Sequence, residues 1–269
     1  MIRNITLVLL VVIVTILWKC SLYPEEEIKM TEEKNKVGII PFEVGLGDHL
    51  SNMLSKNNLN DDYYRKLDIH DSHFLTTFET YASDKEASEG YELHYTDGSC
   101  TVTFPAGRMI HLSLSAGFIE GIAFVMPLEP LSYTKAVSLV DNIIARINRA
   151  GFKQLELNQM PRTGGLPKGW DRFPVGSWKS CAYPNDSISD PISTYFTVDI
   201  RYYSTTFDAP NQYLVRVKSA HYSLEDEADD LMMQRRIEIN GDKNKPLPLS
   251  VWLDNPSWRP KGWKGKYIK

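Results

Sequence analysis

Residues 91–126 read YELHYTDGSCTVTFPAGRMIHLSLSAGFIEGIAFVM, and this stretch contains the clearest secondary-structure pattern of the chain. Apolar and polar residues alternate on both sides of Asp97 and Gly98, a pair that favours a two-residue hairpin turn. With that turn, Tyr95 would pair with Cys100, and the large side chains of both strands would lie on one face. The stretch therefore predicts an antiparallel hairpin with one buried face.

A second hairpin is expected directly after the first. Leucine and isoleucine alternate with polar residues over 110–114, a turn follows at 116–117, and residues 118–126 are apolar almost throughout. A continuous apolar run is typical of a strand that is buried on both faces, so this strand should lie inside a sheet. Its one carboxylate, Glu120, is either an acid with a perturbed pKa or a group that reaches water at a bulge beside Gly121.

An amphipathic helix is predicted at residues 132–150. Apolar residues recur at helical spacing from Ala136 to Ile147, with Ser132 as the expected N-cap and Gly151 as the expected stop. Further strands are expected at residues 152–157, 195–203 and 212–222. The predicted fold class is therefore α+β, a mostly antiparallel sheet with the long helix packed on one face.

The N-terminus carries an apolar run at residues 5–18 that two threonines interrupt. Fourteen helical residues span about 21 Å, which is short of the ~30 Å hydrocarbon core, but Lys19 can snorkel and lengthen the span. No small residues follow the run where a signal peptidase would cleave. We therefore expect an uncleaved signal anchor at residues 1–23, which precedes the globular domain and crosses a bacterial inner membrane once.

Three further segments complete the expected organisation. A charged stalk at residues 24–36 leads to a periplasmic globular domain at 37–257, and a basic, aromatic tail follows at 258–269. That tail is either a disordered end or a segment that lies on anionic lipid or reaches a partner. Cys20 leaves open a second form of membrane attachment, a lipoprotein acylated at this residue, although Lys19 stands where lipoprotein processing requires a small residue.

Charge and cysteine content narrow the class of function. The 30 basic and 34 acidic side chains give a net charge of −4, which does not favour nucleic acid as a partner. In an exported domain, Cys100 and Cys181 are expected to form a disulfide. In a cytosolic domain they would instead be two buried free thiols.

Catalytic motifs are missing from the sequence: it contains neither Gly-x-Ser-x-Gly nor His-Glu-x-x-His. We therefore expect no catalytic residues, no metal ligands and no cofactor. The densest group of metal-binding residue types is His70, Asp71 and His73, which we interpret as a polar turn because the cluster stands alone, with no further partner nearby. His94 and His111 fall on the polar faces of the two hairpins, where solvated or cross-strand roles are expected.

The surface expected to bind a partner combines aromatic and acidic residues. Large aromatic side chains and complementary charge dominate the energy of most interfaces. Core packing is the alternative for the two tryptophans, and a solvated start of a short helix ending near Met233 is the alternative for the acidic run. The candidate residues are Trp170, Trp178, Phe207, Glu225, Asp226, Glu227, Asp229 and Asp230.

The apolar segment ending at Lys19 and Cys20, the expected Cys100–Cys181 bridge and a compact α+β domain occur here together. This combination resembles the membrane-anchored or lipoprotein immunity proteins that bacteria encode beside toxic type VI secretion effectors. The resemblance implies a protein that is not an enzyme and that neutralises an effector of the lipase or cell-wall hydrolase type by direct binding. The alternatives are a structural or accessory subunit of a cell-envelope secretion machine, and an enzyme with an unrecognised site around His70 and His73.

Overall fold

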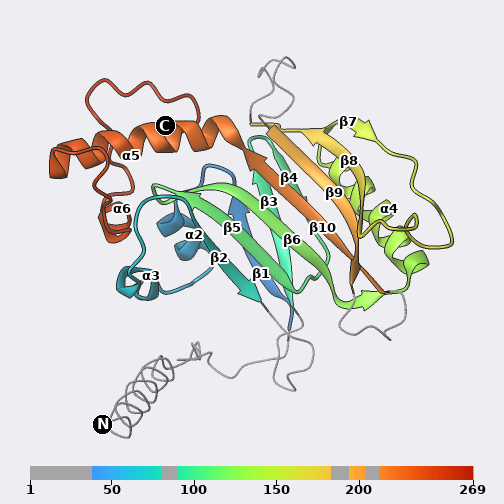
Figure 1. The fold of residues 1–269 in the computed structure, drawn as a ribbon. Coiled ribbons are helices and arrows are strands. Elements are labelled where there is room, and N and C mark those ends of the chain that lie inside the picture. The colour runs from blue at the N-terminus through green and yellow to red at the C-terminus, as the bar shows by residue number, and fades with distance from the viewer. Residues whose placement is uncertain (1–37, 80–89, 183–193, 204–211, 269) are drawn as a thin grey trace, which may run out of the picture. The chain divides into compact units, whose positions relative to one another are not determined.

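The computed structural model describes residues 38–79, 90–182, 194–203 and 212–268, and Figure 1 shows how their helices and strands are arranged. The strands are β1 (Ile40–Gly45), β2 (Phe74–Glu79), β3 (Tyr91–Asp97), β4 (Cys100–Thr103), β5 (Met109–Ser115), β6 (Phe118–Leu131), β7 (Lys153–Leu157), β8 (Arg172–Lys179), β9 (Thr194–Tyr203) and β10 (Gln212–His221). The helices are α2 (Leu50–Lys56), α3 (Asp62–Lys66), α4 (Tyr133–Arg149), α5 (Tyr222–Asn240) and α6 (Ser250–Asp254).

Two sheets confirm the α+β class. One sheet has three strands in the order β1-β3-β4, and the other has seven in the order β2-β5-β6-β10-β9-β8-β7. Among the described strands, only β1 and β3 pair in parallel, so the sheets are mostly antiparallel, as predicted. The strand predicted to be interior, β6, lies between β5 and β10.

The first hairpin forms as predicted, but its register differs. Asp97 pairs with Cys100 and Tyr95 pairs with Val102, so the two turn residues are Gly98 and Ser99. The register is shifted by two residues from the prediction, and a shift of two leaves every side chain on the same face of the strand. For this reason the burial of alternate residues was predicted correctly although the turn was not.

The core lies on one side of the seven-stranded sheet, where α4 and the three-stranded sheet both pack against it (Figure 1). α4 presents Ala136, Val140, Ile143 and Ile147 to this core, all fully buried, at the spacing expected of one helix face. Ser132 is the N-cap residue by its extended backbone, and Gly151 follows the helix with a φ of 96°. The predicted helix and its packing on one face are confirmed.

α5 is longer than the predicted short helix. Its N-cap is His221, whose Nδ1 accepts a hydrogen bond from the backbone N–H of Leu224 at 3.0 Å. The helix continues past Met233 to Gly241, where a φ of 70° ends it. The sequence pattern predicted too short a helix because Ile237 and Ile239, the last two apolar residues of α5, are exposed and do not continue its buried face.

The C-terminal segment is part of the folded domain up to residue 268 rather than a free tail. The carboxylate of Glu227 on α5 accepts backbone hydrogen bonds from Tyr267 at 3.0 Å and Ile268 at 2.8 Å. Ile268 is buried, and the guanidinium of Arg235 lies 4.5 Å from the ring centroid of Trp258. The aromatic residues of this segment, Trp258, Trp263 and Tyr267, therefore pack on the domain itself, whereas Lys261, Lys264 and Lys266 are exposed.

The expected anchor at residues 1–23, the stalk at 24–36 and Cys20 lie outside the described residues. They remain predictions. Within the described ranges, no helix has the length and apolar composition needed to cross a bilayer.

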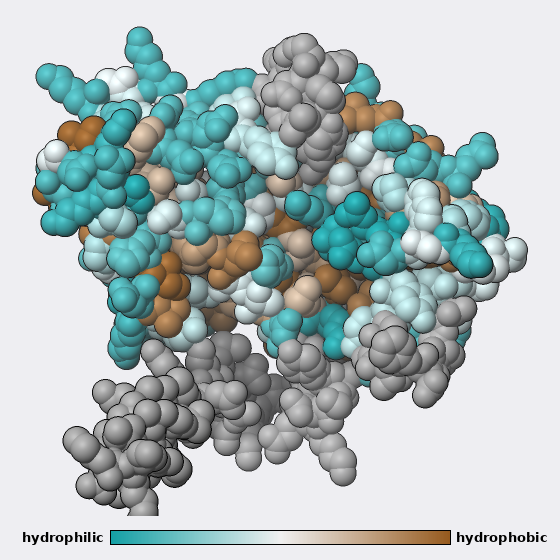
Figure 2. All heavy atoms as spheres, in the orientation of Figure 1, coloured by the Kyte–Doolittle hydropathy of each residue, from teal (hydrophilic) through white to brown (hydrophobic). Residues whose placement is uncertain are grey.

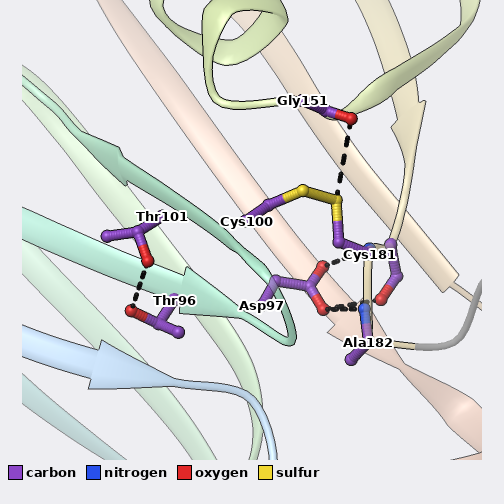
Figure 3. The surroundings of a disulfide bond; sticks show 8 residues. Thr96, Asp97, Cys100, Thr101, Gly151, Cys181 and Ala182 are labelled. Carbon is purple, nitrogen blue, oxygen red and sulfur yellow. Dashed lines mark hydrogen bonds between the residues drawn. A yellow bond between two sulfur atoms is a disulfide. The ribbon is translucent and has the colours of Figure 1, made fainter.

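A disulfide joins Cys100 on β4 to Cys181 after β8, as predicted, with 5.8 Å between their Cα atoms (Figure 3). Asp97 supports the same junction, because its carboxylate accepts hydrogen bonds from the Ser180 hydroxyl at 2.7 Å and the Ala182 N–H at 2.9 Å. This carboxylate is almost fully buried, and burial raises its pKa. Asp97 therefore connects the hairpin to the end of β8 instead of forming the turn.

We expect the stability of the domain to fall as the pH is lowered from about 6.5 to 4, because His49 is buried in its neutral form. Its Nδ1 accepts a hydrogen bond from the Ser51 N–H, and its ring packs edge-on against Phe118 at 4.9 Å. Burial, and secondarily the charge of Arg259, lower the pKa of His49 to about 4. The unfolded chain binds this proton near pH 6.5, so full protonation costs the folded state about 3 kcal/mol.

Urea unfolding at a series of pH values measures this effect. His49 is the N-cap residue of α2, so the matched control is His49→Asn, which keeps an N-cap acceptor but has no ionisable ring. Between pH 7 and 4 the wild-type protein should lose about 3 kcal/mol more than the variant. Equal losses in the two proteins would show that His49 does not control acid sensitivity.

Candidate functional site

On one face of the seven-stranded sheet, no helix among the described residues packs across the centre. On β10, Val215 and Val217 point into the core, whereas Arg216 and Lys218 point to the opposite side. The α4 helix and the three-stranded sheet cover the core side. α5 contacts β5 and β6 close to the turn that joins these two strands. We call the uncovered side the open face. It comprises the outward side chains of β5, β6, β10, β9 and β8, among them His111, Ala123, Arg172, Asp199, Arg216 and Lys218.

A groove crosses the open face. It consists of two hollows of about 370 and 390 Å³ that adjoin along β10, where both are lined by Arg216, Lys218 and Ala220. Small side chains and glycines such as Gly121 and Ala123 make the floor of the first hollow. Figure 2, in the orientation of Figure 1, shows hydrophilic side chains interspersed with small hydrophobic areas.

The centre of the open face, around Asp199, is predominantly basic, whereas Glu120 and Glu225 line one hollow of the groove and Glu156 lines the other. Asp199 on β9 is buried and accepts hydrogen bonds from Arg201 at 2.9 Å and from Arg216 at 2.7 Å. One carboxylate therefore holds two guanidinium groups in fixed positions on neighbouring strands. Arg172 and Lys218 are exposed on either side of this group, so the strip carries more positive than negative charge.

A second cluster lies where the groove meets α5. His73 precedes β2, Glu120 lies on β6 and Glu225 lies in the first turn of α5. One nitrogen or oxygen atom from each of these side chains lies within 4.8 Å of the others. We call these three residues the His73 cluster.

Glu120 occupies this position because β6 contains a bulge. Leu114 pairs with Ile119 and Ser113 pairs with Gly121, which leaves Glu120 as the extra residue of its strand. The predicted bulge is present, but it does not bring the carboxylate to open water, since the Glu120 side chain is only 4% exposed.

The two carboxylate oxygens of Glu120 have different surroundings. Oε1 contacts Nδ1 of His73, whereas Oε2 is buried and has no hydrogen-bond partner among the described residues. Burial raises the pKa of Glu120 to about 7; His73 opposes this rise, and the charges of Glu225 and Asp229 add to it. Of the two alternatives that the sequence left open for Glu120, the structure therefore favours an acid with a raised pKa.

The three residues of metal-binding type that are adjacent in sequence, His70, Asp71 and His73, do not converge on one site. Asp71 is fully buried against Arg236, with the shortest contact at 2.6 Å. His70 is exposed, and His73 instead joins Glu120. His94 and His111 lie on polar strand faces, where they contact Glu92 and Thr77 respectively.

The predicted partner-binding residues separate into several groups. The prediction for Trp178 was wrong. Its side chain is fully buried, and its indole N–H donates to Asn148 at 2.8 Å. Trp178 is therefore a core residue and cannot contact a partner. Trp170 is 51% exposed and packs against Phe173, so it remains a surface candidate. Phe207 lies outside the described residues.

The acidic residues of α5 do not form one surface. Glu225 lines the groove, Glu227 binds the backbone of the C-terminal segment, and Asp229 accepts a hydrogen bond from Ser115 at 3.0 Å. Asp226 and Asp230 are exposed and remain candidates for a partner contact.

Sequence reasoning missed the open face and the His73 cluster. The alternation of Arg216 and Lys218 with valines indicated a strand with one polar face, but not that this face would stay uncovered. Glu120 within an apolar run was the one signal for the cluster, and its partners come from distant parts of the chain.

Comparisons of the chain with protein-family models, with curated proteins and with solved structures find no match.

Proposed function

We propose that this chain is a binding protein that neutralises a toxic secreted effector by covering it with the open face. The observation that carries the proposal is the groove, which crosses several strands of the seven-stranded sheet with no described element packed over it. Side chains on neighbouring strands are held at fixed spacings, and such a surface needs little ordering when it binds.

The size of the open face suits a protein partner. The five strands of the open face, about 4.8 Å apart, span about 19 Å, and strands of ten residues such as β9 and β10 are about 33 Å long. The resulting area of roughly 630 Å² approaches the roughly 800 Å² that each partner buries in a standard protein–protein interface.

The charge of the open face indicates the kind of partner surface that fits. Arg172, Arg216 and Lys218 favour an acidic patch, and Asp199 keeps Arg216 in position for it. Trp170, exposed two residues before β8, would add an aromatic contact at the margin.

The proposed location is the periplasm, with residues 1–23 as a single inner-membrane anchor and a lipid on Cys20 as the alternative. The Cys100–Cys181 disulfide supports an oxidising compartment, because such bonds are rare in the cytosol. In that location the protein would meet an incoming effector before the effector reaches lipid or cell wall.

The test is a rescue experiment. Each protein encoded beside this chain is exported alone to the periplasm of a host cell, and survival is measured with and without the full-length chain. We expect one neighbour to kill the host alone, to be harmless together with this chain, and to form a stable complex with it. If no neighbour is toxic, or if the chain instead co-purifies with several envelope-machine subunits, the proposal is wrong and an accessory role replaces it.

A further inference from the structure

We infer that His73, Glu120 and Glu225 bind one divalent transition-metal ion, with Zn²⁺ as the reference ion. The cluster offers one imidazole nitrogen and two carboxylates, which are ligand types that zinc accepts. Three protein ligands leave a fourth position, and the cluster lines the same groove as His111 and Ser113. The inference goes beyond the proposed function, because it concerns an ion rather than a protein partner.

The spacing of the donor atoms is close to what a metal ion requires. They lie within 4.8 Å of one another, whereas tetrahedral zinc ligands at about 2.1 Å from the ion are about 3.4 Å apart. Glu120 is fixed by the bulge in β6. Glu225 is half-buried at the start of α5, so its side chain has room to close the remaining distance.

A buried oxygen without a partner points to a missing ligand. Within the part of the chain that the structure describes, Oε2 of Glu120 has no hydrogen-bond donor, and burial of an unpaired carboxylate oxygen is costly. The ion pair with His73 satisfies only Oε1, so it does not explain the arrangement by itself. A cation bound between Glu120 and Glu225 would satisfy the second oxygen.

The charge around the cluster also favours a cation. The carboxylates of Glu120, Glu225 and Asp229 lie close enough to interact electrostatically, and His73 is the one basic group in the set. Asp229 is oriented by the Ser115 hydroxyl at 3.0 Å, which holds it beside the cluster rather than in it. A divalent ion would balance this excess of negative charge.

Isothermal titration of the full-length protein with ZnCl₂, after removal of bound metal by a chelator, tests the inference. We expect the wild-type protein to bind one Zn²⁺ per chain. His73→Gln and Glu225→Gln should each weaken binding at least about 10-fold, because each removes one ligand and Glu225 is not part of the core. The matched control is His70→Gln, an exposed histidine three positions away that lies outside the cluster and should bind as the wild type does.

Two further measurements keep the test decisive. Thermal unfolding in excess chelator shows whether each variant is folded, and only folded variants are compared. Co²⁺ in place of Zn²⁺ should give the visible absorption of a low-symmetry site in the wild type and lose it in His73→Gln. The inference is overturned if the wild-type protein binds no Zn²⁺, if the cluster variants bind as tightly as it does, or if His70→Gln weakens binding equally.

Discussion

Asp71→Ala is expected to destabilise the domain by about 4 kcal/mol, because it leaves a buried guanidinium without its counter-ion. Asp71 is fully buried and accepts hydrogen bonds from Arg236 on α5 at 2.6 Å and from the Leu247 N–H at 3.1 Å. The Trp252 indole N–H lies 3.4 Å from its second oxygen. One carboxylate therefore joins the segment before β2 to α5 and to α6.

Urea unfolding of a double-mutant cycle measures the Asp71 contribution. The double variant Asp71→Ala/Arg236→Leu should lose less unfolding free energy than the two single variants lose together, since it removes both charges at once. The matched control is Asp141→Ala at the exposed Asp141–Arg162 pair, whose contact is 2.7 Å and whose removal should cost less than about 1 kcal/mol. A loss at Asp71 as small as that at Asp141 would contradict the account.

Loss of the Cys100–Cys181 disulfide is expected to cost about 4 kcal/mol. The bond closes a loop with a sequence separation of 81, and its removal restores the freedom of that loop in the unfolded chain. The folded state should change little, because Asp97 still binds the Ser180 hydroxyl and the Ala182 N–H (Figure 3).

Chemical unfolding of Cys100→Ala/Cys181→Ala, with and without reductant, checks the disulfide prediction. Reductant should lower the unfolding midpoint of the wild-type protein to that of the variant and leave the variant unchanged. If thiol labelling shows that the wild-type cysteines are reduced and the midpoint has not moved, the bond does not stabilise the domain.

Local patterns predicted the elements whose burial follows from sequence spacing. The hairpins and α4 are of this kind, since alternation and helical periodicity identify a buried face directly. The register of the first hairpin was not predictable by this means, because shifting the pairing of Tyr95 by two residues preserves the face. Asp97 was assigned to the turn because its true partners, Ser180 and Ala182, are distant in sequence.

The candidate sites depended on contacts that no local pattern contains. Trp178 and Trp170 look alike in sequence, yet one is fully buried beside α4 and the other is half exposed. His73, Glu120 and Glu225 come from three elements, so their meeting depends on how β2, β6 and α5 pack together. The apolar run around Glu120 showed that the carboxylate was unusual, but not what it would contact.

The most direct test of the central claim is the affinity between this chain and the toxic neighbour found in the rescue experiment, measured with the open face altered. In Arg172→Glu/Lys218→Glu, two exposed basic side chains of the open face become acidic, and Lys135→Glu makes the same kind of change on the exposed side of α4. We predict that the double variant binds at least about 10-fold more weakly, unfolds at the wild-type midpoint and no longer protects the host, whereas Lys135→Glu behaves as the wild type. Wild-type affinity in the double variant would show that the partner binds elsewhere and would contradict the account.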